Sequence, residues 1–433
     1  MSDLKDLSTK ASQCVKCGTC MANCPIYVET LSEITTPRGK LSLIESLASG
    51  EIALSKRLQD ILFSCLACDT CGESCPNNVK VGEILLAARK ELVNHRGLSP
   101  VKRLLFRHVI SSLRAMPLYL RAGSLIQGLL LKKIPQGSGL HLRFPLPFFD
   151  KKRLIPALAK KFFCDYQPLL AQAQPEKKRV GFFVGCVNNY LFPHIGDSTV
   201  RLLNRNGVSL ITPSDQKCCG LMAFGAGDWS SAQKCALSNI TTFETYNLDT
   251  IITSCASCAA TLKTFYPQMF KDADDETQKR VKQFSSTIMD ISQFLTQEQD
   301  RASALDNNLH QQKNLPKITY HDPCHLKRTL GISQEPRELL QSLSHLEFIE
   351  MDNASQCCGM GGTFTITHYD LSMNVLKHKL DTLEAMDVDM MATGCSGCLL
   401  QFMDGIHQRG LKTKVVHLVE VLERGESSDS DDR

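Results

Sequence analysis

The chain of 433 residues is long enough for several domains, and its hydrophobic content of 43% is sufficient to fill their cores. Its 20 cysteines would suit a secreted disulfide-rich protein, but the polar residues 1–10 lack the apolar segment of a signal peptide. No run approaches the roughly 18 apolar residues that a membrane-spanning helix needs. We therefore expect a cytoplasmic protein with reduced thiols, in which close cysteine spacings favour metal or redox chemistry. Peripheral attachment to the inner face of the cytoplasmic membrane is a further option.

Cysteine content and composition divide the chain into six segments. Eight cysteines lie in residues 1–95 and one in residues 96–175, while 176–297 and 316–424 share five cysteines in the same order. The polar stretch 298–315, rich in Gln, Asn and Asp, is expected to link the last two domains. The acidic end, 425–433, is expected to form a disordered tail.

Two cysteine motifs of the same form dominate the N-terminal segment. Each reads Cys-x2-Cys-x2-Cys-x3-Cys-Pro, the first beginning at Cys14 and the second at Cys65. In bacterial ferredoxins the three closely spaced thiolates bind one [4Fe-4S] cluster, and the cysteine before proline binds the other cluster. We therefore expect two [4Fe-4S] clusters, one held by Cys14, Cys17, Cys20 and Cys75, the other by Cys65, Cys68, Cys71 and Cys24. A pair of zinc ribbons is the alternative, but zinc sites typically use two CxxC pairs.

About fifty residues separate the two motifs, and those at 38–64 have a helical pattern. A compact ferredoxin would place its motifs closer together. The segment resembles the helical ferredoxin module of succinate-dehydrogenase-type and heterodisulfide-reductase-type iron–sulfur subunits, which implies an all-α domain.

The net charge of +4 is unevenly distributed, since residues 96–161 contain fourteen Lys and Arg against a single acid. This segment has no recognised nucleic-acid-binding motif, so we expect no nucleic-acid partner. Its Leu-rich run, 104–134, suits an amphipathic helix that lies on a membrane or a partner subunit. A packed helical linker with a solvated basic face explains the same pattern equally well.

The segments 176–297 and 316–424 form an internal repeat. In each, a short apolar run ends on a cysteine, Cys-Cys-Gly follows, and a second apolar run precedes Cys-x2-Cys. Matching cysteines lie 138, 139 or 140 residues apart, which indicates duplication. Strand-like runs that alternate with helical stretches, such as 230–246 and 371–385, predict a small α/β domain in each repeat, with its cysteine loops at one sheet edge. The candidate metal ligands are Cys186, Cys218, Cys219, Cys255 and Cys258 in the first repeat, and Cys324, Cys357, Cys358, Cys395 and Cys398 in the second.

Cys-Cys-Gly occurring twice is a specific signal, because glycine lets the backbone approach a bulky inorganic core. Residues 176–424 resemble the cysteine-rich (CCG) domain family. With the ferredoxin module, the whole chain resembles the iron–sulfur subunits of glycolate oxidase, D-lactate dehydrogenase and anaerobic glycerol-3-phosphate dehydrogenase. The fold class implied is multidomain α+β, with an all-α ferredoxin-like module that holds two [4Fe-4S] sites followed by two duplicated α/β domains.

This resemblance implies an iron–sulfur electron-transfer subunit of an oxidoreductase complex. An FAD-dependent partner subunit would oxidise a 2-hydroxy acid such as glycolate or D-lactate, and the electrons would pass through this chain to a quinone or another membrane acceptor. No glycine-rich dinucleotide fingerprint is present, so the flavin is expected on the partner. The motif Pro37-Arg38-Gly39-Lys40-Leu41 is similar to the glycolate oxidase pattern.

Both cysteines of each Cys-x2-Cys are present, whereas glycolate oxidase subunits often keep one. The complete sets resemble the catalytic subunit of heterodisulfide reductase, in which each set holds a noncubane cluster that cleaves a disulfide. The alternative function is therefore disulfide reduction, and one or two clusters beyond the two cubanes are an option for the repeats. A zinc-stabilised scaffold is a third reading.

A few residues outside the motifs have a simpler interpretation. His321 and His325 flank Cys324 and would suit cluster tuning or proton transfer, but a histidine hydrogen-bonded in a loop is the expectation. Cys164 and Cys235 fall outside every motif and are expected to be packed thiols.

Overall fold

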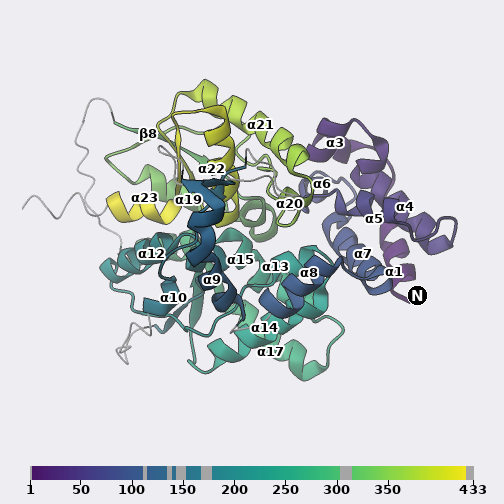
Figure 1. Ribbon diagram of the computed structural model, residues 1–433, viewed down its shortest axis with the longest axis horizontal. Helices are drawn as coiled ribbons and strands as arrows, with labels where there is room; N and C mark the ends of the chain where they lie inside the picture. The colour runs from purple at the N-terminus through teal and green to yellow at the C-terminus, as the bar shows by residue number, and fades with distance from the viewer. Residues whose placement is uncertain are drawn as a thin grey trace, which may run out of the picture.

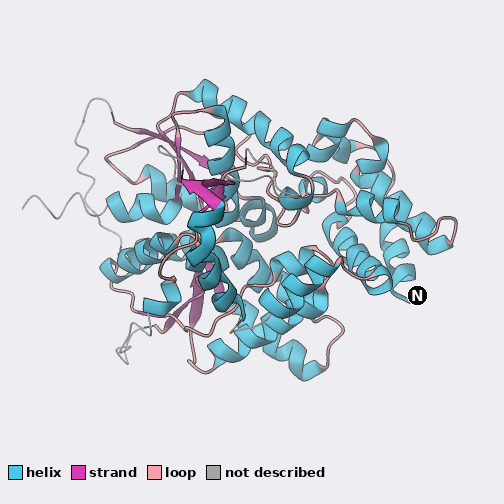
Figure 2. Cartoon of the chain, in the orientation of Figure 1, coloured by secondary structure: helices cyan, strands magenta, loops and turns pink. Residues whose placement is uncertain are grey.

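The computed structural model describes residues 2–110, 115–133, 139–142, 153–166, 178–302 and 315–425. In Figure 1 the N-terminal helices lie at one end of the molecule, and the two repeats lie beside each other at the other end. Figure 2 shows that the strands are confined to the end with the repeats. The expected multidomain α+β architecture is confirmed.

The N-terminal module contains only helices. They are α1 (Ser2–Ala11), α2 (Thr19–Ala22), α3 (Pro25–Thr30), η1 (Glu33–Thr35), α4 (Pro37–Ser49), α5 (Lys56–Phe63), α6 (Thr70–Glu73) and α7 (Val81–Arg96). Leu41, Ile44, Leu62 and Leu85 are buried and form its core. The helical stretch expected at 38–64 is two helices, because Gly50 takes the left-handed conformation that ends α4.

The basic segment contains helices and, unexpectedly, a small antiparallel sheet. Its helices are α8 (Pro100–Leu104), the π-helical turn η2 (Leu105–Ile110), α9 (Ala115–Leu130) and α10 (Phe163–Tyr166), and its strands are β1 (Leu131–Lys133), β2 (Gly139–Leu142) and β3 (Ile155–Pro156). Sequence analysis missed these strands because each has two to four residues and no regular alternation. In the part of the chain that the structure describes, no helix is both long and apolar enough to span a bilayer.

The first repeat is a four-stranded parallel sheet between helices. Strands β4 (Val180–Phe182), β5 (Leu210–Ile211), β6 (Thr250–Thr253) and β7 (Ile288–Asp290) lie in the order β5-β4-β6-β7. The helices are α11 (Cys186–Tyr190), α12 (Pro193–Arg205), α13 (Leu221–Gly225), α14 (Trp229–Glu244), α15 (Ala256–Ala260), η3 (Thr261–Phe265), α16 (Tyr266–Met269), α17 (Asp275–Ser286) and α18 (Ile291–Ala302). The boundary expected at 297 falls within α18, because the polar residues there continue a helix that buries Phe294 and Leu295.

The second repeat has the same topology. Strands β8 (Lys317–His321), β9 (Glu347–Phe348), β10 (Met390–Thr393) and β11 (Lys414–His417) lie in the order β9-β8-β10-β11, again all parallel. The helices are η4 (His325–Thr329), α19 (Glu335–Gln341), α20 (Phe364–Thr367), α21 (Tyr369–Met386), α22 (Ser396–Arg409) and α23 (Leu418–Gly425). Most of the expected linker and tail, 303–314 and 426–433, lies outside the described residues.

The three modules pack so that their cysteine loops meet. Helices α12 and α15 of the first repeat contact α23 and α22 of the second, and α3 and α7 of the N-terminal module contact α21 and α13. In Figure 1, α20 and α21 lie next to α3 and α6. The buried Arg89 of α7 donates hydrogen bonds to the carbonyls of Leu62, Cys65 and Gly225, which ties the N-terminal module to the first repeat.

Candidate metal centres

Two hollows in the N-terminal module are lined by the motif cysteines. One, of about 390 Å³ including space open to solvent, is lined by Cys14, Cys17, Cys20 and Cys75 together with Cys71. The other, of about 430 Å³ counted in the same way, is lined by Cys24, Cys65, Cys68 and Cys71. Each hollow thus contains all four cysteines of one ligand set expected from the motifs, and the first contains Cys71 in addition. Cys71 borders both hollows, so the two sites are direct neighbours.

The cysteine loops around these hollows share an unusual backbone conformation. Lys16 and Gly18 in the first loop have positive φ values of 58° and 87°, and Ala67 and Asp69 at the matching places have 52° and 54°. Left-handed residues that alternate with right-handed ones point successive N–H groups into one concavity, which suits an anion such as an iron–sulfur core. Both loops therefore fit the cluster expected from their thiols.

The Pro-Arg-Gly-Lys motif places one cation at each hollow. Pro37 opens α4 after Thr36, whose hydroxyl accepts the N–H of Gly39. A Cβ at Gly39 would lie 2.2 Å from the Glu33 carbonyl oxygen, so only glycine fits this turn. Arg38 lines the first hollow, and Lys40, which is buried and donates to the Ser64 carbonyl at 2.8 Å, lines the second. Positive charge at both sites offsets the negative charge of bound thiolates.

Three thiols of the second hollow, those of Cys24, Cys68 and Cys71, are harder to ionise than that of Cys17. Burial raises the pKa of Cys24 to about 11. Cys17 is exposed, and a hydrogen bond with the Thr19 hydroxyl, 3.4 Å away, lowers its pKa. A bound metal would favour the thiolate form of all these groups.

The five motif cysteines of the first repeat form one continuous series of sulfur contacts. Cys186 Sγ lies 3.6 Å from Cys218 Sγ, Cys218 contacts Cys219, Cys219 contacts Cys258, and Cys258 contacts Cys255. Each cysteine lies in a loop or helix start that follows a parallel strand, which is where the expected sheet edge gathers them.

The second repeat has the same series in the same order. Cys324 contacts Cys357, Cys357 contacts Cys358, Cys358 Sγ lies 3.4 Å from Cys398 Sγ, and Cys398 contacts Cys395. Interactions with the thiols of Cys357 and then Cys398 hold the pKa of Cys358 well below its usual value. Two compact sets of five soft donors thus fit metal ions or metal–sulfur cores.

Contacts between modules join these sites into one sequence. Cys68, in the second ferredoxin motif, lies in one buried cluster with Cys357 of the second repeat, and the two thiols influence each other's pKa. Cys395 of the second repeat and its counterpart in the first, Cys255, likewise share a buried cluster and influence each other's pKa. The order in space is therefore the two N-terminal sites, the second repeat and then the first.

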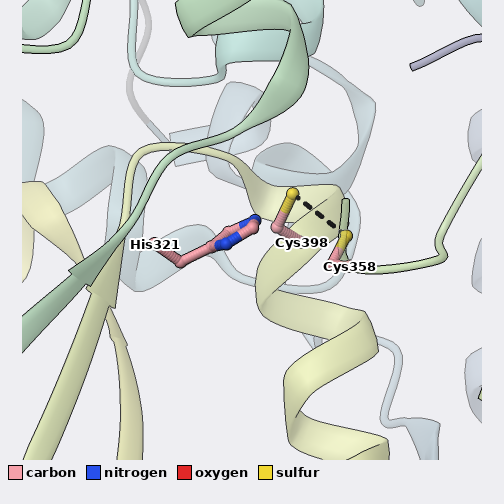
Figure 3. A group of neighbouring side chains, drawn as sticks. All are labelled: His321, Cys358 and Cys398. Atoms are coloured by element: carbon pink, nitrogen blue, oxygen red, sulfur yellow. Dashed lines mark hydrogen bonds between the residues drawn. The ribbon is translucent and has the colours of Figure 1, made fainter. Parts of the chain in front are cut away.

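His321 differs from the expectation of a loop histidine held by hydrogen bonds. It ends strand β8 and is fully buried. Among the described residues, neither ring nitrogen makes a hydrogen bond of normal geometry, and the ring interacts with the thiol of Cys358. One ring nitrogen and the sulfurs of Cys358 and Cys398 all lie within 4.8 Å of one another. Figure 3 shows the imidazole pointing toward the two sulfurs. The duplication contained a signal for this residue, because the matching position of the first repeat is Phe183 and a polar residue there is unusual.

The other residues outside the motifs have the simpler roles. His325 Nδ1 lies 3.0 Å from the Ser257 hydroxyl of the first repeat, as a hydrogen-bonded histidine should. Cys235 is fully buried in the core, and Cys164 is partly buried.

Lys379, which was not predicted from the sequence, is buried beside the five cysteines of the second repeat and donates hydrogen bonds to the carbonyls of Asn353 and Ala354. Burial lowers its pKa to about 7.

Comparisons with known proteins agree with this architecture. A 4Fe-4S dicluster domain model matches residues 10–79, and a cysteine-rich domain model matches residues 180–263 and 318–403. A probable glycolate oxidase iron-sulfur subunit of Bacillus subtilis is 32% identical over 428 residues, which cover 94% of this chain and 92% of the relative. The chain belongs to the family of glycolate-oxidase-type iron–sulfur subunits.

Further relatives extend this family assignment. One subunit of a fumarate reductase (CoM/CoB) from Methanothermobacter marburgensis is 29% identical, covering 97% of this chain and 73% of its own. Lactate utilization protein A 2 of Bacillus cereus is 30% identical over 247 residues, which cover 57% of this chain and 98% of that protein. A hypothetical protein from Helicobacter pylori has a solved structure with a TM-score of 0.50 and 10% identity, covering 91% of this chain and 70% of that one, so it shares the fold.

Proposed function

We propose that this iron–sulfur subunit conducts electrons within an oxidoreductase complex whose flavoprotein partner oxidises a 2-hydroxy acid. The observation that carries the proposal is the unbroken series of cysteine groups, from the paired hollows through Cys68–Cys357 and Cys395–Cys255 to the first repeat. Such a series places potential redox centres next to one another across three separate modules. A structural metal site requires no such continuity.

Each N-terminal hollow would hold a [4Fe-4S] cluster, with Cys14, Cys17, Cys20 and Cys75 at one and Cys24, Cys65, Cys68 and Cys71 at the other. A bound cluster takes up and releases one electron at a time, with a potential set by charge, hydrogen bonds to sulfur and exposure. Arg38 and Lys40 supply the positive charge, and the left-handed loops supply N–H donors. Cys24 and Cys68 are buried, so their side of the second hollow is shielded from solvent.

The relatives support the proposed substrate and partners. Their names concern glycolate oxidation and lactate utilisation, so we assign the partner as an FAD-dependent glycolate or D-lactate dehydrogenase subunit. Electrons would leave to a quinone or another acceptor at the membrane. A second candidate, disulfide reduction at a five-cysteine set, draws support from the complete sets and from the fumarate reductase relative.

The test is to combine the anaerobically purified chain with the flavoprotein subunit and to follow its visible absorbance. We expect a brown protein with at least about eight irons, as two cubane clusters require. It should be bleached by the 2-hydroxy acid only when the flavoprotein is present. Bleaching by substrate without the partner would overturn the conduit role, and so would clusters that stay oxidised in the complete mixture. Oxidation of the reduced chain by a disulfide, but not by a quinone analogue, would favour the second candidate.

A further inference from the structure

We propose that His321 is a nitrogen ligand of a transition-metal centre in the second repeat, which makes this centre a mixed imidazole–thiolate site while the first repeat has thiolates alone. This inference rests on the proposal that the repeats bind metal. It adds a donor that the cysteine motifs do not contain.

The geometry of His321 matches that of a ligand without its metal. A ring nitrogen of His321 and the sulfurs of Cys358 and Cys398 are mutually within 4.8 Å, and all three residues are buried. The three donors come from three separate parts of the repeat: the end of β8, the Cys-Cys-Gly loop and helix α22 (Figure 3). A single ion or one edge of a metal–sulfur core can therefore contact all three.

The ring nitrogens of His321 lack ordinary hydrogen-bond partners. Buried imidazole nitrogens are normally hydrogen-bonded. In the part of the chain that the structure describes, neither nitrogen of His321 makes a hydrogen bond of normal geometry, and the group with which the ring interacts is the thiol of Cys358. The edge of the Phe402 ring packs against the imidazole, with 4.8 Å between centroids, so the ring is held by packing.

The first repeat provides an internal comparison. The position matching His321 is Phe183, which is buried and packs against Phe243. All five cysteines are present in both repeats, so the duplicated sites differ at this position by one donor. At the metal, the neutral imidazole of His321 would take a coordination position that a thiolate takes in the first repeat, which lowers the negative charge of the centre and raises its reduction potential, as in Rieske centres. The centre of the second repeat should therefore be reduced before that of the first.

The experiment compares His321→Phe, His321→Cys and the matched control Phe183→His as full-length, anaerobically purified chains. Iron, zinc and sulfide are counted per chain, and pulsed EPR measures nitrogen couplings to the reduced centres. The wild type should show one directly coordinated imidazole nitrogen. His321→Phe should lose this coupling and the iron of one site. Phe183→His should keep the wild-type coupling.

His321→Cys keeps the result interpretable if His321→Phe does not fold. Because cysteine supplies a soft donor at the same place, this variant should retain the metal, lose the nitrogen coupling and be reduced at a lower potential. Unchanged couplings in both variants would overturn the proposal, and so would a wild-type coupling of only hydrogen-bond size. If the wild type contains only the roughly eight irons of two cubanes and no zinc, the repeats bind no metal and this proposal is overturned. The conduit role is tested separately, by the bleaching of the clusters in the presence of the flavoprotein.

Discussion

Gly359 shows how a single residue shapes a cysteine loop. It follows the cysteine pair of the second repeat with a φ of 86°, and a Cβ there would lie 2.4 Å from the Ser372 carbonyl oxygen. Gly220 holds the matching place in the first repeat with a φ of 87°. Glycine is therefore needed at both positions for two reasons: it tolerates the positive φ, and it leaves room for the long helix that follows to pack closely.

Gly359→Ala should destabilise the protein more than Gly362→Ala does. Both glycines have positive φ, but nothing lies within 4 Å of a Cβ at Gly362, so the control carries only the conformational cost. We expect a further loss of about 1–3 kcal/mol for Gly359→Ala, as overpacking typically costs. Denaturant unfolding of the two variants measures this difference, and equal midpoints would contradict it.

At the residue scale, the grouping of the ferredoxin cysteines around two hollows could be predicted, because it follows from the local spacing of the motifs. Cys24 and Cys75 each line the hollow that is formed by the other motif. This is the arrangement in bacterial ferredoxins, where the cysteine before proline binds the other cluster. His321 could not be found in this way, because its relation to Cys358 and Cys398 exists only after the sheet has formed. Lys379 was missed for the same reason, since a lysine in a helix usually faces solvent.

At the scale of elements, Arg89 on α7 is the main polar tie between the N-terminal module and the first repeat. Its guanidinium donates hydrogen bonds to the carbonyls of Leu62 and Cys65 in its own module and of Gly225 in the first repeat. The centroid of the Phe63 ring lies 5.1 Å from the guanidinium carbon. Gly227 also approaches α7, since a Cβ there would lie 2.5 Å from the Arg89 carbonyl oxygen. The backbones of the two modules therefore pack directly against each other at this point.

Arg89→Met should lower the free energy of unfolding by about 3 kcal/mol or more, because several buried carbonyls lose their donor. Arg280→Met is the matched control, since Arg280 and its partner Glu244 are both 41% exposed and such pairs contribute about 1 kcal/mol at most. Calorimetry of the two variants gives the comparison. Equal losses would show that Arg89 is not a structural tie.

The last residues of β7 and β11 predict opposite pH effects. Burial raises the pKa of Asp290 to about 6, with Glu335 and Cys395 adding repulsion. Burial lowers the pKa of His417 to about 4, against attraction from Glu420 and Cys395 and with repulsion from His194. Between pH 4 and 6 the folded state thus holds an extra proton on Asp290, and the unfolded state holds one on His417. The proton on Asp290 therefore makes the free energy of unfolding fall as the pH rises through this range, whereas the titration of His417 makes it rise.

Asp290→Asn should therefore make stability rise more steeply from pH 4 to 6, and His417→Asn should make it fall. Each contribution is about 3 kcal/mol from shifts of about two units. Urea midpoints measured across this range for wild type and both variants test the signs. Parallel curves for all three proteins would refute the assignment.

The main strands and long helices were predictable because their patterns are local and occur twice. Helices α14 and α21 lie close to the expected 230–246 and 371–385. The three strands of the basic segment were not, since they pair only with each other and are too short for a periodic signal. The course of α18 past residue 297 depends on core contacts that its polar composition conceals.

At the scale of the whole molecule, Arg328 lies at the junction between the N-terminal module and the second repeat. Its side chain is 4% exposed, it pairs with Glu73 at 2.7 Å, and it donates to the Ser355 carbonyl. Cys68 and Cys324 both attract its charge. Its Nη1 has no hydrogen-bond partner among the described residues, so the guanidinium keeps capacity to interact with charge at this junction.

Arg328→Gln should slow electron passage from the N-terminal clusters to the second repeat by at least about tenfold, because loss of the buried charge disfavours an electron at the junction. Rapid freeze-quench EPR after photoreduction follows the signals of each module in time. Glu73→Gln is the control, since it breaks the ion pair but keeps the arginine. An Arg328→Gln rate equal to that of wild type would place the electron path elsewhere.

The contact between Cys255 and Cys395 also bears on how the chain arose. These residues are counterparts in the duplication, so their contact lies on the pseudo-two-fold axis that relates the repeats. An unduplicated ancestor with this packing would have been an isologous homodimer in which one cysteine met its own copy. In such a dimer every substitution appears on both sides of the axis. Joining the two halves in one chain allowed His321, Lys379 and His417 to arise opposite Phe183, Asn239 and Asp290, and thus gave an originally symmetric pair of sites a direction.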